Sequence, residues 1–332
     1  MESLGGGSNA VEVFAVGGAN GQGSRPSQED QYIIHIAGDL PSEYKDTHAL
    51  FAVFDGHGGE LVSKHAKAHV ADLFFSSPSF KSGNYEDAIQ EAIIKEDELL
   101  LREFQQGENA YAISGSTASI AIVDLRRGLL VVGNVGDSHI ILAERDSGSG
   151  EVKSERLTTS HKPESPEEKQ RIRQAGGQIH EQHAITRIGS LNMSRALGDL
   201  QYKTPLISVT SVEQTDAQEA ATQEHSAHTE DLISVKISSR RVELDKNKEY
   251  MLALTTDGIT NVIDDITLMS NMIGLFNHGG NAEQVAGAMV NEATGRPQSD
   301  NSTCIAVVVN GGDAPIKQGV GEQTGYQDGI WK

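Results

Sequence analysis

Four stretches of this sequence place an acidic residue at the edge of an apolar run, where a carboxylate could bind a cation or help to activate water. They are Phe54-Asp55-Gly56, Val135-Gly136-Asp137, Thr256-Asp257-Gly258 and Ser299-Asp300-Asn301. The pair Glu29-Asp30 borders another apolar run. Asp-Gly is a common turn dipeptide, so a turn explains each acid taken singly. Several acids in the same setting need a further explanation.

Carboxylates that gathered at one end of a sheet would repel one another and raise each other's pKa unless cations neutralised them. Hard divalent ions such as Mg²⁺ and Mn²⁺ prefer oxygen ligands of this kind. Two such ions about 3.5–4 Å apart can activate a bridging water. The sequence has no Cys/His pair at the usual zinc spacing. The acids are far apart in the chain, so their spacing alone does not predict that they converge.

The charge balance limits the partners of the protein. The chain of 332 residues has 27 Lys and Arg against 47 Asp and Glu, a formal net charge of −20. This acidity argues against nucleic acid or an anionic membrane as the main partner. It would also repel a phosphorylated substrate unless cations lay in the site.

Cysteine content and hydropathy limit the compartments in which the protein is expected. The single cysteine, Cys304, excludes an intramolecular disulfide and fits a reducing environment. No apolar stretch reaches the roughly 18–20 residues that span a bilayer. Residues 1–9 match neither a secretory signal nor an Arg-rich transit peptide. We expect a soluble intracellular protein with no membrane partner, and cytoplasm, nucleus and mitochondrial matrix stay open.

The elements that must position the acids are mostly short strands. Strands are predicted at 11–16, 31–36, 48–54, 116–124, 129–135, 139–143, 152–157, 206–212, 231–237, 249–255 and 303–309. Helices are predicted at 59–75, 85–104, 164–175 and about 282–293. Asn84 and Asn281 are placed to cap the second and fourth helices. Strands in runs with helices in pairs favour an α+β layered architecture.

The chain is expected to form one domain over residues 10–312, because no linker divides its strand-rich parts. Residues 213–230 are polar, acidic and free of large apolar side chains. They predict a mobile acidic insert, with a short solvated helix as the alternative. Residues 1–9 and 313–332 are expected to be flexible tails.

The order of the motifs resembles that of the metal-dependent type 2C serine/threonine protein phosphatases (PPM type), from about residue 14 to residue 310. The matching segments are Arg25-Pro26-Ser27-Gln28-Glu29-Asp30, Phe54-Asp55-Gly56-His57-Gly58-Gly59, Ser114-Gly115-Ser116-Thr117-Ala118, Gly136-Asp137-Ser138, Lys162-Pro163, Arg171-Ile172, Ala175-Gly176-Gly177, Ser194-Arg195-Ala196-Leu197-Gly198-Asp199, Asp257-Gly258 and Asp300-Asn301-Ser302. Chance does not explain all of them in this order. The resemblance implies a type 2C catalytic domain with a four-layer α-β-β-α sandwich, two antiparallel sheets flanked by helix pairs.

The resemblance also implies two Mg²⁺ or Mn²⁺ ions in a cleft at one end of the sheets. Asp55 would bridge both ions, and Asp257 and Asp300 would complete the first. The second would use Asp55, the carbonyl of Gly56 and, through water, Glu29. A glycine suits that place because no side chain then blocks the approach of its carbonyl to the ion.

By the same resemblance, Arg25 would hold the substrate phosphate with its planar guanidinium. His57 would act as general acid toward the departing serine or threonine oxygen. A metal-bridging hydroxide would attack phosphorus in line, without a phosphoenzyme. The implied function is a protein serine/threonine phosphatase that acts on phosphorylated protein substrates as a monomer.

The sequence departs from the family at Asn261, where members commonly carry an aspartate. In the family that aspartate helps to hold a weaker third ion together with Asp137 and Asp257. Asn261 keeps an oxygen ligand but loses a charge, so we expect a third site that is weak or absent. The aromatic residue usual after Asp257-Gly258 is also missing, with Ile259-Thr260 in its place.

Two alternative functions stay open. A catalytically silent phosphatase-like domain could serve as a binding subunit, although Asp55, Asp257 and Asp300 are all present. A two-metal hydrolase of another phosphoester is the other, and the charge of −20 counts against a nuclease. The resemblance implies that the stretch 194–199 is mainly structural and lies near the cleft. The histidines interpreted as structural or exposed are His35, His65, His69, His180 and His183.

Overall fold

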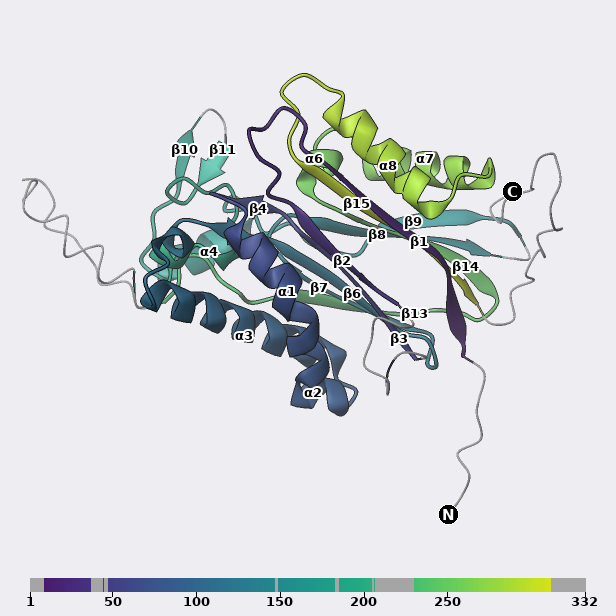
Figure 1. Cartoon of the computed structure of the whole chain (residues 1–332), viewed down its shortest axis with the longest axis horizontal. Coiled ribbons are helices and arrows are strands. Elements are labelled where there is room, and N and C mark those ends of the chain that lie inside the picture. Colours follow the sequence, from purple (N-terminus) through teal and green to yellow (C-terminus); the bar gives the residue numbers. More distant parts are fainter. Residues whose placement is uncertain are drawn as a thin grey trace, which may run out of the picture.

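Two five-stranded antiparallel sheets lie face to face, and helices cover the outer face of each (Figure 1). The computed structural model describes residues 9–36, 44, 47–146, 149–182, 185–204, 206 and 230–311. The insert predicted at 213–230 and the tails predicted at 1–9 and 313–332 lie outside these residues, apart from Asn9 and Glu230. The predicted α+β sandwich is confirmed.

The first sheet has the strand order β1-β15-β14-β8-β9. Its strands are β1 (Val11–Gly21), β15 (Ser302–Gly311), β14 (Lys248–Thr255), β8 (His139–Asp146) and β9 (Val152–Arg156). Strand β15 is buried along its whole length and pairs with both β1 and β14. A continuous apolar strand of this kind is expected where both faces of a sheet are covered.

The second sheet has the order β13-β7-β6-β3-β2. Its strands are β13 (Ser238–Glu243), β7 (Leu129–Val135), β6 (Ala118–Asp124), β3 (His48–Phe54) and β2 (Gln31–His35). The three inner strands are buried throughout, whereas the edge strand β13 is polar and largely exposed. Charged side chains on an edge strand protect its open side from unwanted pairing.

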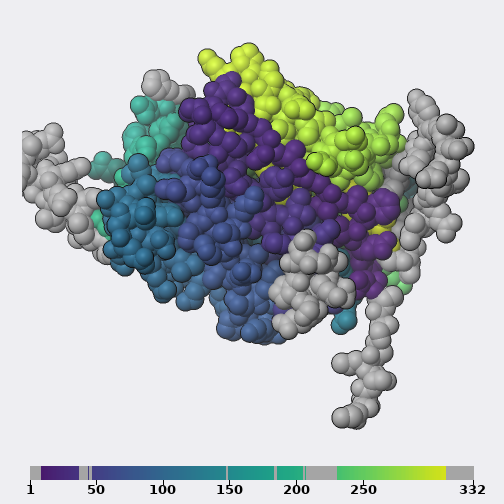
Figure 2. Space-filling model, viewed as in Figure 1, coloured from purple at the N-terminus to yellow at the C-terminus, as the bar shows by residue number. Residues whose placement is uncertain are grey.

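Helices cover both sheets. The second sheet carries α1 (Leu61–Ser76), α2 (Pro78–Lys81) and α3 (Tyr85–Gln105), and the first carries α7 (Asp265–Asn277) and α8 (Ala282–Thr294). The remaining helices whose bounds lie within the described residues are α4 (Pro166–Gln174), α6 (Asp257–Thr260) and the 3₁₀ turns η1 (Asn109–Ala112) and η2 (Leu200–Tyr202). Figure 2 shows the N-terminal strands as a purple band between the blue helices α1–α3 and the yellow-green pair α7 and α8.

Two small sheets complete the fold. One has the order β12-β5-β4 and joins β12 (Leu197–Gly198), β5 (Gly115–Ser116) and β4 (Gly56–His57). The other is the hairpin of β10 (His180–Gln182) and β11 (Ile185–Arg187). None of the helices within the described residues is long and apolar enough to cross a membrane.

Three apolar layers hold the sandwich together. Phe51, Tyr250 and Ile305 belong to the core between the sheets. Phe74 and Ile93 belong to the layer beneath α1 and α3, and the remaining layer lies under α7 and α8. Burial of apolar side chains on this scale is the main favourable contribution to folding.

The structure corrects several sequence predictions. The strand predicted at 231–237 is wrong, because Leu232 and Ile233 pack into a cluster with α4 and the pairing strand is β13. The strand predicted at 206–212 lies outside the described residues, apart from Leu206. Helix α7 was not predicted at all.

The two predicted helix caps have different outcomes. Asn84 stands at the start of α3, but its side chain donates to Asp87 and caps no backbone N–H. Asn281 caps α8 as predicted, because its Oδ1 accepts from the Gln284 N–H at 2.9 Å. Gln284 accepts from the Asn281 N–H in return, which completes a capping box.

The core between the sheets can be tested with one chemical change made at two places. Ile305→Ala removes a side chain that is 0% exposed and should lower the free energy of unfolding by about 2–5 kcal/mol. Ile266→Ala, at a side chain that is 72% exposed on α7, should change it by less than about 0.5 kcal/mol. Urea denaturation at fixed Mg²⁺ measures both, and equal losses would contradict the assignment of the core.

Candidate active site

The acid-bearing ends of the second sheet meet because of strand register. Gln31, the first residue of β2, pairs with Phe54, the last residue of β3. Asp30 therefore lies beside Asp55, with Glu29 one residue further out. Both strand ends are at the end of the sandwich that β4 and α6 mark in Figure 1.

The first sheet brings three more acids to the same end. Thr255, the last residue of β14, pairs with Cys304 near the start of β15 and with His139 at the start of β8. Asp257 follows β14, Asp300 precedes β15, and Asp137 lies in the turn before β8. Antiparallel pairing thus gathers the ends or beginnings of five strands, β2, β3, β8, β14 and β15, at one end of the sandwich.

The acids are close enough to perturb each other's ionisation. Burial raises the pKa of Asp55 well above its usual value, and the charges of Asp30, Asp257, Asp137 and Asp300 raise it further. Burial and the charge of Asp137 raise the pKa of Asp257 to about 6. A cation placed among these carboxylates would remove the repulsion.

Asp30 is the most enclosed member of the cluster. Its side chain is buried, and burial raises its pKa to about 7 although Thr303 and Thr256 donate to it. Both hydroxyls reach Oδ2, at 2.8 and 2.9 Å, and Oδ1 has no hydrogen-bond partner. A buried oxygen without a partner is costly, so a water or an ion is the expected neighbour.

Two cationic side chains already rest on the cluster. An Arg25 terminal nitrogen lies 2.6 Å from Asp300 Oδ2. Lys162 Nζ donates to Asp137 Oδ2, while the Oδ1 of that buried carboxylate has no partner. Asp30, Asp55 and Asp257 have no ion pair of this kind among the described residues, so an added cation could neutralise them. The chemistry of the donor set, carboxylates with a nearby main-chain carbonyl, fits hard divalent ions.

Gly56 is required by its surroundings. A Cβ at this position would collide with the carbonyl oxygen of Glu29. The Glu29 carboxylate itself accepts from Ser27 Oγ at 2.7 Å and from the Gly59 N–H at 3.1 Å. Glu29 is therefore fixed beside the loop that carries Asp55 and Gly56.

Asp199, which the sequence analysis interpreted only as part of a structural stretch, holds His57. The Nε2 of His57 lies 2.7 Å from Oδ2 of Asp199, which is completely buried. The small sheet explains the contact, because Gly115 of β5 pairs with His57 on one side and with Gly198 on the other. A Cβ at Gly115 would collide with the Asp199 carboxylate.

Asp199 also shows backbone strain. Its φ of 50° lies in the left-handed region that non-glycine residues rarely adopt. Such strain is tolerated where surrounding contacts fix a functional conformation. A sequence signal was present, since Gly198-Asp199 repeats the Gly-Asp order of Gly136-Asp137.

The Asp199 carboxylate tunes His57. Burial acts to lower the pKa of His57, but the charge and hydrogen bond of Asp199 outweigh it and raise the pKa above its usual value. The charges of Asp137 and Glu29 act in the same direction. The imidazole is thereby favoured in its protonated form, which can donate a proton.

All eight residues that the sequence analysis selected lie at this end of the sandwich. They are Arg25, Glu29, Asp55, Gly56, His57, Asp137, Asp257 and Asp300. The structure adds Asp30, Lys162 and Asp199 to them. The individual roles of these residues remain predictions.

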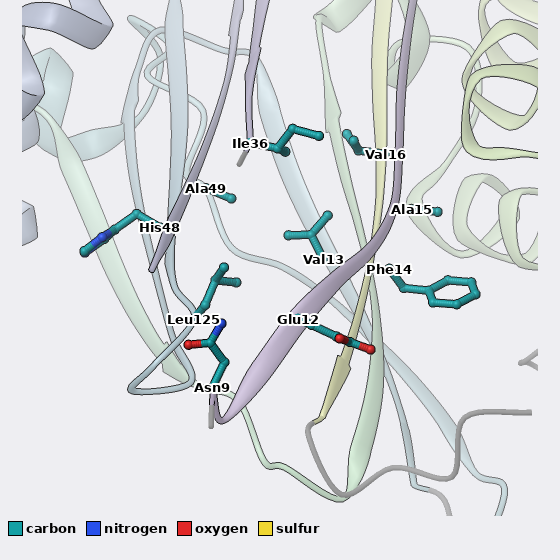
Figure 3. A pocket seen from close by; sticks show the side chains of 10 residues that line it. All are labelled: Asn9, Glu12, Val13, Phe14, Ala15, Val16, Ile36, His48, Ala49 and Leu125. Carbon is teal, nitrogen blue, oxygen red and sulfur yellow. The ribbon is translucent and has the colours of Figure 1, made fainter. Parts of the chain in front are cut away.

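A cavity of about 420 Å³ lies elsewhere, between β1 and β3 (Figure 3). It is at the start of both strands, whereas Asp55 follows the last residue of β3. Among the described residues that line it, Glu12 is the only acid, and most of the others are apolar. The cavity has no means to bind several cations and is not the candidate site.

Comparison with known proteins identifies relatives of the chain. The family model described as protein phosphatase 2C matches residues 14–302. Protein phosphatase 2C 1 of Paramecium tetraurelia is 36% identical over 190 residues, which cover 55% of this chain and 58% of that protein. Protein phosphatase 2C homolog 2 of Schizosaccharomyces pombe is 34% identical over 183 residues, 55% of this chain and 46% of that one. The matched region thus spans about half the length of these curated relatives.

Solved structures share the fold. The crystal structure of serine-threonine phosphatase 2C from Toxoplasma gondii aligns with a TM-score of 0.72 and 22% identity, over 91% of this chain and 98% of that chain. A C. elegans sex determining protein aligns with a TM-score of 0.69 and 22% identity, over 90% and 65% of the two chains. At this level of identity the comparison supports the fold alone.

The His57–Asp199 contact predicts a change in ionisation. Asp199→Asn keeps the shape of the side chain but removes the charge, so the pKa of His57 should fall. Histidine NMR titration of the wild type and the variant at the same Mg²⁺ concentration measures the difference. His139 is an internal control, because burial lowers its pKa to about 4 and its value should not move. An unchanged pKa of His57 would contradict the assigned contact.

Proposed function

This chain belongs to the protein phosphatase 2C family, and we propose that it is a metal-dependent phosphatase that hydrolyses phosphoserine and phosphothreonine in proteins. One observation carries the proposal. Five aspartates from separate elements, Asp30, Asp55, Asp137, Asp257 and Asp300, gather at one end of two sheets, where burial and the charges of the other four raise the pKa of Asp55 well above its usual value. Such a cluster supports a site for divalent cations and a phosphate ester.

The residues that would hold two Mg²⁺ or Mn²⁺ ions are Asp55, Asp257, Asp300, the carbonyl of Gly56 and Glu29. This donor set supports the assignment, because all of its ligands are oxygens of the kind these ions prefer. When bound, the ions supply positive charge for the phosphoryl oxygens and an activated water as the nucleophile. The remaining steps depend on side chains of the chain itself.

Arg25 is suited to bind the phosphate. Its side chain is 57% exposed, and its contact with Asp300 Oδ2 leaves other N–H groups free to face the solvent. Gln22 donates to the Arg25 carbonyl at 2.8 Å and so restrains the main chain of this loop. A guanidinium can donate hydrogen bonds to two phosphoryl oxygens at once, which would orient the phosphorus for in-line attack.

His57 is suited to protonate the leaving serine or threonine oxygen. Its Nε2 is engaged with Asp199, and its buried Nδ1 has no hydrogen-bond partner. Nδ1 is therefore the nitrogen that would donate the proton, while Asp199 stabilises the imidazolium. The alkoxide leaves as an alcohol, and the neutral imidazole then takes up a proton from solvent.

No covalent phosphoenzyme is part of the proposal. The lone thiol, Cys304, is buried in β15, and burial raises its pKa to about 12. A thiol with so little thiolate is a poor nucleophile. Direct attack by water therefore remains the proposed route.

A third ion site beside Asp137 and Asp257 is proposed to be weak or absent. Asn261 Nδ2 donates to Asp257 Oδ2 at 3.0 Å, so the amide presents a donor toward that carboxylate. Lys162 donates to Asp137 in the same region. Both carboxylates that would hold a third ion already accept hydrogen bonds from N–H groups, which reduces their demand for another cation.

The activity has a direct test. Hydrolysis of a phosphothreonine peptide should require Mn²⁺ or Mg²⁺, stop with EDTA, and fall roughly a hundredfold or more in Asp55→Asn, because a metal ligand loses its charge. Asp72→Asn, the same change at an exposed position of α1, should keep full activity. Phosphate release is the measurement.

The alternatives give different results in the same assay. A folded protein inactive on several phosphopeptides and metals would contradict the proposal and favour the silent binding domain. Activity confined to small phosphomonoesters or phosphodiesters would favour a hydrolase of another phosphoester.

Asn261→Asp should strengthen a third ion site by restoring a charge beside Asp257 and Asp137. Calorimetric titration with Mn²⁺ should give two tight equivalents for the wild type and a third for the variant. Asn291→Asp makes the same charge change at an exposed position of α8 outside the proposed ligand set and should leave two. Three tight equivalents in the wild type would refute the predicted loss of the third site.

A further inference from the structure

A second group of metal-ligand side chains lies on the helices that cover the second sheet. His65 and His69 belong to α1, and Glu96 belongs to α3, which packs beside α1 (Figure 1). One ligand atom from each of the three residues lies within 4.8 Å of the others. None of the three takes part in the proposed phosphatase reaction.

The two histidines are placed on one face of α1. They are four residues apart, which is the spacing of neighbours on a helix surface. Their Nδ1 atoms are 3.1 Å apart, and their ring centroids are 4.1 Å apart. Two imidazole nitrogens that share a tetrahedral Zn²⁺ at about 2.0–2.1 Å lie about 3.3 Å from each other. The pair is therefore close to the separation that one shared ion needs.

Glu96 aims a buried charge at the histidines. Its side chain is 0% exposed, and Oε1 lies 2.6 Å from His65 Nδ1. The other oxygen, Oε2, is buried without a hydrogen-bond partner. Since an unpaired buried carboxylate oxygen is costly, a hydrogen bond to His65 alone leaves half of this carboxylate unsatisfied.

Each histidine Nδ1 in the group also faces more than one possible hydrogen-bond partner. His69 Nδ1 faces both the His65 carbonyl oxygen, at 2.9 Å, and His65 Nδ1. His65 Nδ1 faces Glu96 as well. If each Nδ1 carries a proton toward its oxygen acceptor, the two N–H groups crowd each other. One cation in place of both protons would bind all three side chains and relieve this crowding.

We propose that His65, His69 and Glu96 form a binding site for one transition-metal ion of the Zn²⁺ type. Two imidazoles and one carboxylate favour Zn²⁺ over Mg²⁺, which prefers oxygen ligands alone. Three protein ligands leave a fourth position for water or an external ligand. The ion would link α1 to α3, and its ligands are separate from those of the aspartate cluster.

The sequence analysis found no Cys/His pair at zinc spacing and interpreted both histidines as structural or exposed, and so it overlooked this pair. Their spacing, in His65-Ala66-Lys67-Ala68-His69, matches the two zinc-binding histidines of helical metal sites. The third ligand could not be found from the sequence, because Glu96 reaches the pair only through the packing of α3 on α1.

Calorimetric titration of the full chain with Zn²⁺, in excess Mg²⁺, tests the site. The wild type should bind one tight equivalent that His69→Ala weakens by roughly a hundredfold, because a direct ligand is lost. His180→Ala removes an exposed histidine of the β10–β11 hairpin and should leave that equivalent unchanged. Any Zn²⁺ that binds to the aspartate cluster should do so equally in the wild type and both variants, so it does not affect the difference in affinity between them.

Two further measurements separate metal binding from a structural role. Glu96→Gln keeps the side-chain shape and should also weaken the equivalent, with circular dichroism showing a folded protein. In the wild type, one equivalent of Zn²⁺ should shift the imidazole ¹⁵N resonances of His65 and His69 but not that of His180. Equal Zn²⁺ affinity in the wild type and His69→Ala, or unmoved His65 and His69 resonances, would overturn the proposal and leave a plain His65–Glu96 hydrogen bond.

Discussion

Electrostatic repulsion among buried carboxylates is the constraint on which the rest of this structure depends. Burial raises the pKa of Asp55 well above its usual value and that of Asp30 to about 7, and each neighbouring charge adds to the effect. A domain stabilised by only about 5–15 kcal/mol cannot hold several unpaired charges together without compensation. Part of this compensation comes from threonine hydroxyls that donate to Asp30, and part from the side chains of Lys162 at Asp137 and Arg25 at Asp300. The remainder is the negative charge that the proposed divalent ions would neutralise.

The strong pairing of two apolar sheets makes such a cluster sustainable. Strands β3 and β14 are inner strands of different sheets, and the apolar core that their side chains share holds their ends together. A one-residue slip of β14 would turn its apolar face away from the core. The free energy gained by burying residues such as Ile305 therefore fixes the register that holds Asp257 near Asp55.

Sequence patterns predicted what is local and missed what depends on packing. Asp55 and Asp257 were found because each directly follows an apolar strand, but only the family resemblance indicated that they meet. Asp199 was missed as a partner of His57. The two residues are brought together by the small sheet β12-β5-β4, and strands of two residues are too short to show a periodic pattern in the sequence. The strand at 231–237 was predicted wrongly, because its apolar residues pack against α4 and look the same in sequence as a paired strand.

The helices on the second sheet connect the outer surface to the proposed proton donor. In α3, Glu96 faces α1, and the adjacent Asp97 accepts from the Gly198 N–H at 2.8 Å and from Lys203 Nζ at 2.7 Å. Gly198 precedes Asp199, whose strained backbone places its carboxylate on His57. A displacement of α3 against α1 would therefore reach the imidazole through one backbone hydrogen bond and one side-chain contact. The packing of this helix pair is for that reason part of the geometry of the candidate active site.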